Sequence, residues 1–176
     1  MDITVKLQRC RTPLSSADVR YAAQQMLRAY GVRRAELSVV FLDGATIRKL
    51  NRDFLGHDFV TDVVTFDFQG YARNPIVRRW TLDVSWRPAS GVQRLAIKVP
   101  ACIDGEIYIC PAEARRNAKL YGEPISRELL RYLAHGILHL LGLDDSTPAE
   151  RDRMRQSEDE LLSLLGTPDT GHKTQE

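Results

Sequence analysis

The stretch RELLRYLAHGILHLLGLDD (residues 127–145) decides how this sequence is interpreted. Wound as a helix, it is apolar on nearly every face, which predicts a central, buried helix from about Ser126 to Gly142. His135 and His139 are four residues apart and therefore share one face of that helix. Because two unpartnered imidazoles are costly to bury in an apolar helix, we expect them to have a common partner.

A metal ion is the partner that this spacing favours. Two imidazoles at positions i and i+4 can hold one cation through their ring nitrogens. Gly142 can adopt the left-handed conformation that ends a helix abruptly, so the chain can return and bring Asp144 or Asp145 towards the histidines. Three protein ligands with an open fourth position are typical of catalytic zinc sites. The alternative is a chance histidine pair in an ordinary core, but the pair, the glycine and the acids rarely occur together.

Position 136 narrows the class of reaction. Gly136 stands where the H-E-x-x-H metallopeptidases carry a glutamate that acts as general base. Its absence argues against peptide hydrolysis by that mechanism. We expect the glycine to leave space above the metal for a bulkier substrate.

The remaining pattern predicts a single α+β domain over residues 1–166, followed by a flexible polar tail at 167–176. The expected strands cover residues 3–7, 36–42, 60–68 and 106–110, and the expected helices cover 16–30, 45–53, 111–121 and 148–165. These elements favour a mixed sheet of about four to five strands with helices over one face or both.

Composition excludes several classes of protein. The 176 residues are 43% hydrophobic and 27% charged, which is typical of a globular protein. The net charge of +2 excludes a polybasic protein but not a local basic patch. No apolar run is long enough to span a membrane, the N-terminus does not look like a signal peptide, and the three cysteines lack close partners. We therefore expect a cytoplasmic protein with reduced thiols and no membrane contact.

The clearest shift in composition falls in residues 69–101, which we call the basic segment. Its glycines and prolines predict a hairpin or loop. Asp83 is its only acid, against six cations: Arg73, Arg78, Arg79, Arg87, Arg94 and Lys98. Such cations can meet phosphates, and Arg78 and Arg79 are candidates for substrate binding. Trp80 and Trp86 either stack on unpaired bases or pack on the core.

The segment HGILHLLGLDD (135–145) resembles the H-G-x-L-H-L-x-G-Y-D-H signature of the YbeY family of rRNA-maturation endoribonucleases. LNRDFLGHDFVTDVVTFDF (50–68) and DGEIYIC (104–110) are similar to two further segments of that family, in the same order. The resemblance covers most of residues 1–165 apart from the basic segment.

The resemblance implies an α+β fold with a zincin-like core and a central metal-binding helix. It also implies a zinc-dependent, cytoplasmic hydrolase that cleaves phosphodiester bonds in single-stranded RNA. The family acts in the maturation of the 3′ end of 16S rRNA and in ribosome quality control. The implied partners are therefore single-stranded RNA, rRNA and the small ribosomal subunit.

Several site residues follow from the resemblance. His135 and His139 carry over as metal ligands, and Asp145 occupies the third ligand position, where the family usually has histidine. A carboxylate is an acceptable zinc ligand that also suits Mn²⁺ or Mg²⁺. Leu55 stands where many members have an arginine linked to activity. A phosphate contact would then come from Arg52, from His57 or from an arginine of the basic segment.

The remaining assignments leave alternatives open. His57 and Asp58 lie in a polar loop, as candidates for proton transfer or substrate positioning, or as ordinary loop residues. Asp144 either orients an imidazole or is a solvated turn acid. The attacking group is a metal-bound water or the ribose 2′-hydroxyl. The rival functions are a zinc peptidase or other metallohydrolase, and a non-catalytic ribosome-assembly factor with a structural metal. The sequence does not indicate an oligomeric state.

Overall fold

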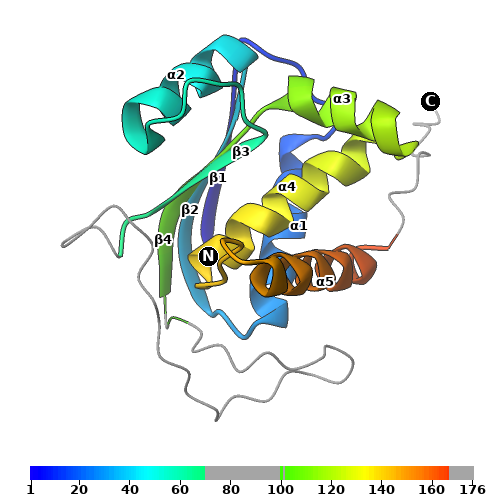
Figure 1. Ribbon diagram of the computed structural model, residues 1–176. Coiled ribbons are helices and arrows are strands. Elements are labelled where there is room, and N and C mark those ends of the chain that lie inside the picture. The colour runs from blue at the N-terminus through cyan, green and yellow to red at the C-terminus, as the bar shows by residue number, and fades with distance from the viewer. Residues whose placement is uncertain (70–99, 101, 167–176) are drawn as a thin grey trace.

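Four strands form one mixed sheet in the computed structural model, which describes residues 1–69, 100 and 102–166 (Figure 1). The strands are β1 (Asp2–Gln8), β2 (Arg34–Leu42), β3 (Val63–Asp67) and β4 (Cys102–Ile109). Their order across the sheet is β1-β2-β4-β3. The first three of these run parallel, and β3 lies antiparallel to β4 at the edge. The predicted mixed sheet is confirmed.

Five helices in the described residues pack on the two faces of this sheet. They are α1 (Ser16–Ala29), α2 (Gly44–Leu55), α3 (Pro111–Tyr121), α4 (Ile125–Leu140) and α5 (Pro148–Leu164). Figure 1 shows α1, α4 and α5 together on one face, with α2 on the other. The α+β class predicted from the order of elements is therefore confirmed.

Alternation along β2 separates two clusters of buried side chains. Leu37, Val39 and Phe41 belong to the large core that includes residues of α1, α4 and α5. Val40 and Leu42 point to the opposite face and join a smaller cluster with residues of α2 and β3. Successive side chains of a strand alternate between faces, so one strand serves both cores.

Helix α4 occupies the centre of the large core, as predicted. Leu129, Leu133 and Ile137 are each at most 1% exposed. The helix begins at Ile125, next to the predicted Ser126, and Pro124 is its N-cap residue. This helix therefore holds most of its side chains in a buried environment.

Two strands, β3 and β4, differ most from the predicted bounds. β3 covers Val63–Asp67 and not 60–68, because its partner β4 ends at Ile109, just before Pro111 opens α3. β4 starts at Cys102, four residues before the predicted Glu106, because the whole segment pairs with β2. Strand pairing here overrides the weak strand propensity of an aspartate and a glycine.

Both ends of the basic segment lie together at one end of the sheet. Asp67 of β3 is paired with Gly105 of β4, and the Phe68 amide donates to the Asp104 carbonyl at 2.9 Å. The expected hairpin, with Arg78 and Arg79, lies outside the described residues, as does the tail at 167–176. No helix in the described part of the chain has the length and apolar character needed to cross a bilayer.

Candidate metal centre

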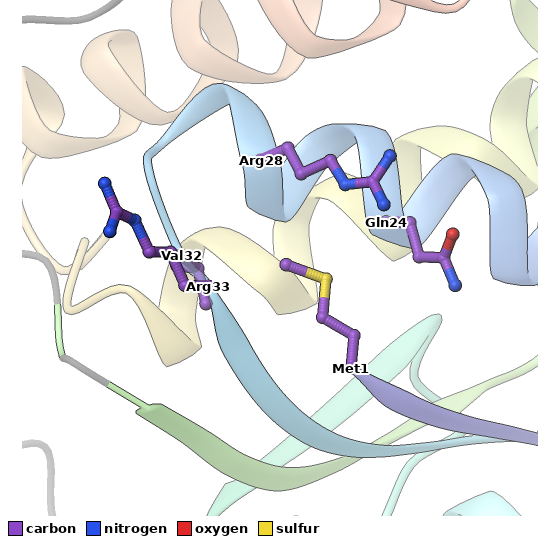
Figure 2. A pocket seen from close by; sticks show the side chains of 5 residues that line it. All are labelled: Met1, Gln24, Arg28, Val32 and Arg33. Atoms are coloured by element: carbon purple, nitrogen blue, oxygen red, sulfur yellow. The ribbon is translucent and has the colours of Figure 1, made fainter.

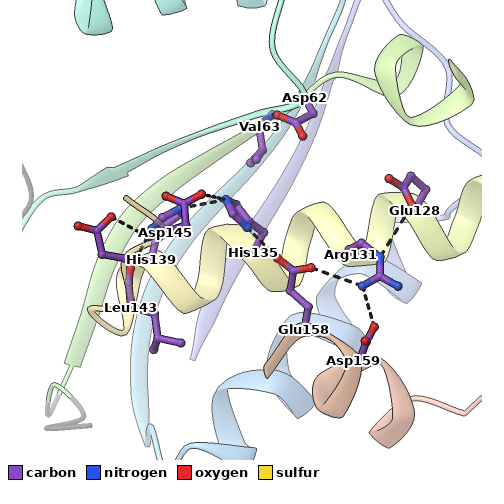
Figure 3. A network of polar contacts seen from close by, with 11 residues as sticks. Asp62, Val63, Glu128, Arg131, His135, His139, Leu143, Asp145, Glu158 and Asp159 are labelled. Carbon is purple, nitrogen blue, oxygen red and sulfur yellow. Dashed lines mark hydrogen bonds and ion pairs between the residues drawn. The ribbon is translucent and has the colours of Figure 1, made fainter. Parts of the chain in front are cut away.

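Two successive turns of α4 bring two imidazoles to a common point. The Nε2 atoms of His135 and His139 are 2.9 Å apart, and the ring planes are nearly perpendicular, at 87° (Figure 3). Spacing by four residues places both side chains on one face of the helix, as the sequence predicted.

The end of α4 brings a carboxylate to the same point. Gly142 has a φ of +90°, in the left-handed region that L-residues avoid, and its amide donates to the His139 carbonyl at 2.9 Å. The chain then reverses, as predicted, and places the Asp145 Oδ2 atom 3.9 Å from the Nε2 atom of His135. Ligand atoms of His135, His139 and Asp145 all lie within 4.8 Å of one another, so the structure brings together the three predicted ligands.

The hydrogen bonds of the two rings fit a bound cation. The Nδ1 atom of His139 lies 2.9 Å from the Leu143 carbonyl, which can only accept, so this nitrogen is the donor. The Nδ1 atom of His135 lies 2.8 Å from the Glu158 carboxylate, which when ionised also only accepts. Both neutral rings then present a lone pair at Nε2, and two facing lone pairs need a proton or a cation between them. Two imidazole nitrogens and a carboxylate oxygen are a donor set suited to zinc.

Glu158 of α5 is a functional residue that reasoning from the sequence missed. It is only 6% exposed, and Arg131 reaches its carboxylate at 3.4 Å while also pairing with Asp159 at 2.7 Å. No role in the metal centre was expected for Glu158 from the sequence. A signal was present: position 158 falls on the same helical face as the buried Met154 and Leu161, where a lone carboxylate needs a partner.

The environment moves the two imidazole pKa values apart. Burial acts to lower the pKa of His135, but the hydrogen bond and charge of Glu158, with the charges of Asp145 and Asp62, outweigh it and raise the pKa above the ordinary value. Burial, then the charge of the neighbouring His135, lowers the pKa of His139. A single proton at this pair is therefore held by His135 and donated to His139.

The start of β3 borders the centre. Asp62 lies near His135 in Figure 3, and its backbone carbonyl accepts from the Cys110 amide at 2.8 Å. Its side chain accepts from the Val63 amide at 2.9 Å and from Thr61 at 3.0 Å. No role for Asp62 was expected from the sequence. Asp62 therefore lies just before the edge strand β3, on the side of the sheet that faces His135.

The expectation for Gly136 is wrong. A Cβ at this position would lie 2.7 Å from the Cγ2 atom of Ile107 and 3.0 Å from the Oγ1 atom of Thr65. The glycine therefore lets α4 pack closely against β3 and β4, and it leaves no space for a substrate.

The polar residues after α2 form a separate group. Asp58 accepts two hydrogen bonds from Arg48, at 2.9 and 3.0 Å, and this pairing lowers the pKa of Asp58. Arg52 lies 3.3 Å from Asp53 and 3.8 Å from Asp58. His57 stacks on a phenylalanine ring, with centroids 5.6 Å apart. The structure does not bring Arg52, His57 or Asp58 into the three-ligand cluster, and their assigned roles stay predictions.

Asp144 shapes the turn that carries the third ligand. Its Oδ1 atom accepts from the Asp145 amide at 2.8 Å and from the Ser146 hydroxyl at 2.9 Å. The contacts that orient the imidazoles come from Glu158 and from the Leu143 carbonyl. Of the two alternatives for Asp144, these contacts favour the turn acid.

A pocket of about 370 Å³ lies beside the N-terminus, away from this centre (Figure 2). Its lining residues are Met1, Gln24, Arg28, Val32 and Arg33. None of them belongs to the histidine cluster, so the pocket and the candidate metal centre are separate features.

In this α+β fold, two histidines and a carboxylate meet at the end of the buried central helix. The fold and the site together place the chain among proteins with a candidate metal centre on such a helix. The family described as Endoribonuclease YbeY matches residues 4–166 of this sequence. The chain therefore belongs to the YbeY family, and the resemblance seen in its motifs is confirmed.

Individual relatives agree with this assignment. The chain is 33% identical to the Endoribonuclease YbeY of Chlorobium phaeovibrioides, over 89% of this chain and 86% of that protein. It is 37% identical to the Endoribonuclease YbeY of Pelotomaculum thermopropionicum, over 82% of each chain. The solution structure of TM1509 from Thermotoga maritima has the same fold, with a TM-score of 0.56 at 20% identity over 99% of both chains.

Proposed function

We propose that this chain is a metal-dependent endoribonuclease that cleaves single-stranded RNA during the maturation of ribosomal RNA. The observation that carries the proposal is the pair of facing Nε2 atoms, 2.9 Å apart, with the Asp145 carboxylate beside them. The family assignment supports an RNA substrate, since the relatives that match most of the chain are named endoribonucleases.

The metal would be held by His135, His139 and Asp145. Zinc is the ion proposed, because imidazole nitrogen and carboxylate oxygen both suit it, while the carboxylate also accommodates Mn²⁺ or Mg²⁺. When bound, such an ion supplies a Lewis acid for a phosphate oxygen and lowers the pKa of a bound water. Glu158 keeps the His135 ring in the tautomer that offers Nε2 to the ion.

The substrate contact would use cations outside the three-ligand cluster. Leu55 replaces the arginine common in the family, so Arg52 is the nearest cation in sequence that can meet a phosphate. Its pairs with Asp53 and Asp58 are exposed, and exposed pairs exchange readily for another anion. Arg78 and Arg79 of the basic segment are further proposed contacts.

The proposed setting is the cytoplasm, with the 3′ end of 16S rRNA on the small ribosomal subunit as substrate. The peptidase alternative is not favoured, because Gly136 provides no general base and the family is one of ribonucleases. The assembly-factor alternative predicts metal binding without cleavage.

The direct test is chelator-sensitive cleavage. The protein is purified with its native metal, the metal content is measured, and a labelled single-stranded RNA is incubated with and without chelator. We expect about one ion per chain and cleavage that chelation abolishes and added zinc restores. Absence of chelator-sensitive cleavage would contradict the proposal, and peptide cleavage with the RNA intact would support the peptidase.

Two variants complete the test. His139→Ala removes a proposed ligand and should abolish cleavage while circular dichroism shows an intact fold. If this variant cleaves RNA as the unchanged protein does, the proposal of a catalytic metal is wrong. If the variant unfolds, the metal is at least partly structural. His57→Ala tests the proton-transfer role and should lower the cleavage rate without changing metal content.

A further inference from the structure

The end of α2 and the turn that follows it expose large apolar side chains. Every residue from 52 to 60 is exposed, with Phe54 at 60%, Phe59 at 56% and Leu55 at 47%. Single exposed apolar residues are ordinary on protein surfaces, but several together on one segment mark a binding surface.

Aromatic rings connect this turn to the sheet. Phe54 contacts Phe66 of β3 edge to face, with ring centroids 5.3 Å apart. Phe66 contacts Tyr108 of β4 in the same way, at 5.8 Å. Phe59 follows Phe54 by five residues in the same exposed segment, and we call Phe54, Phe59, Phe66 and Tyr108 together the aromatic surface. Phe66 and Tyr108 support it from the sheet, and Phe54 and Phe59 present their rings to solvent.

The exposed rings are held in place before any ligand binds. The Asn51 side chain is 2% exposed and donates to the Phe59 carbonyl at 3.1 Å. Gly56 has a φ of +76°, which allows the sharp end of α2, and His57 stacks on the Phe59 ring. A fixed surface loses little conformational entropy when it binds a partner.

The aromatic surface lies close to the candidate metal centre. Phe59 is three residues before Asp62, and an extended chain of three residues spans about 10 Å. Asp62 in turn lies near His135, as Figure 3 shows. A polymer with a phosphate at the histidines can therefore reach Phe59 with its neighbouring units.

We infer that the aromatic surface stacks the unpaired bases of an RNA strand beside the phosphodiester held at the metal centre. This inference rests on the proposed function and adds how the strand is positioned. Rings that every base can stack on, next to exposed cations, are typical of single-strand binding. Helix α2 supplies those cations as Arg48, Lys49 and Arg52, and Lys49 forms no ion pair with a described residue. Bases in a duplex are already stacked, so such a surface selects single strands.

The test replaces rings by an apolar side chain without a ring. Phe54→Leu and Phe59→Leu are made singly and together, and binding of a fluorescent single-stranded RNA is followed by anisotropy in chelator, so that no cleavage occurs. Each substitution should weaken binding about fivefold or more, because stacking on one ring contributes roughly 1–3 kcal/mol per base. Phe54→Tyr and Phe59→Tyr keep the ring and should bind normally. Tyr121→Leu, on an aromatic residue that is 70% exposed on α3, is the matched control and should have no effect.

Two measurements on the unchanged protein keep the inference testable if a variant misfolds. An RNA with abasic sites keeps its charge and should bind as weakly as the double leucine variant binds normal RNA. Irradiation of iodouridine-substituted RNA should crosslink to the peptide that contains Phe54 and Phe59. Equal binding of normal and abasic RNA would overturn the inference.

Two further outcomes separate the inference from its alternatives. Self-association of the unchanged protein that the double leucine variant loses, with RNA binding unaffected, would assign the surface to a second copy of the chain and overturn the inference. Because binding is measured without metal, loss of the proposed nuclease activity and loss of base stacking are read out independently. Ring-dependent binding without cleavage would uphold the surface and overturn only the proposed nuclease.

Discussion

The contact between Glu158 and His135 controls what the centre can bind. The carboxylate fixes the protonated nitrogen of the ring at Nδ1, and Arg131 fixes the carboxylate. The group that accepts a hydrogen bond from the other ring nitrogen determines both the orientation and the basicity of a metal-binding imidazole. One residue outside the proposed ligand set is therefore expected to decide much of the metal affinity.

Glu158→Gln tests this expectation. The amide keeps the shape of the side chain but loses the charge, so we expect metal affinity to fall by about 10–100-fold. Competition with a chromophoric chelator measures the change. Asp159→Asn is the control, because Asp159 pairs with Arg131 but touches neither imidazole. Unchanged affinity in Glu158→Gln, or an equal loss in both variants, would contradict the role of Glu158.

Gly136→Ala tests the close approach of α4 to the sheet. The added Cβ meets Ile107 at 2.7 Å. Overpacking costs about 1–3 kcal/mol, and better helix propensity returns about 1, so the free energy of unfolding should fall by up to about 2 kcal/mol. Urea denaturation measures it. Gly44→Ala is the control, because its Cβ would lie at an ordinary 3.5 Å from Val60. A stabilised Gly136→Ala would show that the sheet yields easily.

Single residues show where the sequence was informative and where it was not. Helical periodicity and one glycine made it predictable that His135, His139 and a following acid meet, because these signals are local. The choice of Asp145 over Asp144 came from the resemblance to the YbeY family. Glu158 and Ile107 act across the fold, and a single sequence does not reveal which distant side chain will face a given position. Gly136 was misinterpreted for this reason: its purpose is set by the sheet packed against it.

At the scale of elements, helix ends control the geometry of the centre. The left-handed Gly142 ends α4 and turns the chain so that Leu143 and Asp145 reach the histidines. Gly122 ends α3 in the same conformation, with a φ of +69°, and a Cβ added there would meet nothing within 4 Å. The two glycines therefore share a backbone conformation, but only Gly142 directs a ligand-bearing turn.

Gly142→Ala and Gly122→Ala separate backbone strain from ligand placement. Each places an L-residue in the left-handed region at a cost of about 1–2 kcal/mol, so both should lower the free energy of unfolding. Only Gly142→Ala should also weaken metal binding, because only that turn carries a proposed ligand. Denaturation and calorimetric zinc titration measure the two effects. Equal metal affinity in the two variants would contradict the proposed purpose of Gly142.

Local sequence signals predicted which helices and strands form better than they predicted the residues at which these elements begin and end. The capping box formed by Thr147 and Glu150 marks the start of α5 both in the sequence and in the structure. β3 and β4 were misjudged at their ends, because a strand extends as far as its partner allows. Residues 60–62 have strand-like composition but face a partner strand that has already ended.

At the scale of the whole molecule, the opposite pKa shifts of the two histidines make the stability of the metal-free protein depend on pH. The folded pKa of His135 lies above its ordinary value of 6.5, so its contribution to stability is complete below 6.5 and is lost as the pH rises through the folded pKa. The folded pKa of His139 lies below 6.5, so stability falls as the pH drops from 6.5 towards that value. Without metal, this pair should make the protein most stable near pH 6.5.

Zinc should change how the stability of the protein varies with pH. Metal binding requires both rings without the Nε2 proton, so a saturating ion should stabilise the fold increasingly as the pH rises above 6.5. Urea denaturation at several pH values, with chelator or with zinc, measures both profiles. If stability varies with pH in the same way with chelator and with zinc, the proton and the metal do not compete for the Nε2 atoms of the two histidines.

Topology was the least predictable feature at this scale. The order β1-β2-β4-β3 places β3, an antiparallel strand, at the edge beside the centre. Pattern alone indicates that a segment is a strand but not which strand it will pair with, so the sequence supported a mixed sheet without its order.

The hydrogen bond between Phe68 and Asp104, with the pairing of Asp67 and Gly105, bears on how the chain can change over evolution. The sheet fixes the residues that flank the basic segment side by side, so a change in the length of the segment need not move β3 or β4. For a flexible connection between two fixed ends, each doubling of length costs only about 0.6 kcal/mol in closure entropy. Lineages can therefore lengthen or shorten it at little thermodynamic cost, and an engineer can insert a reporter domain there without moving the histidines.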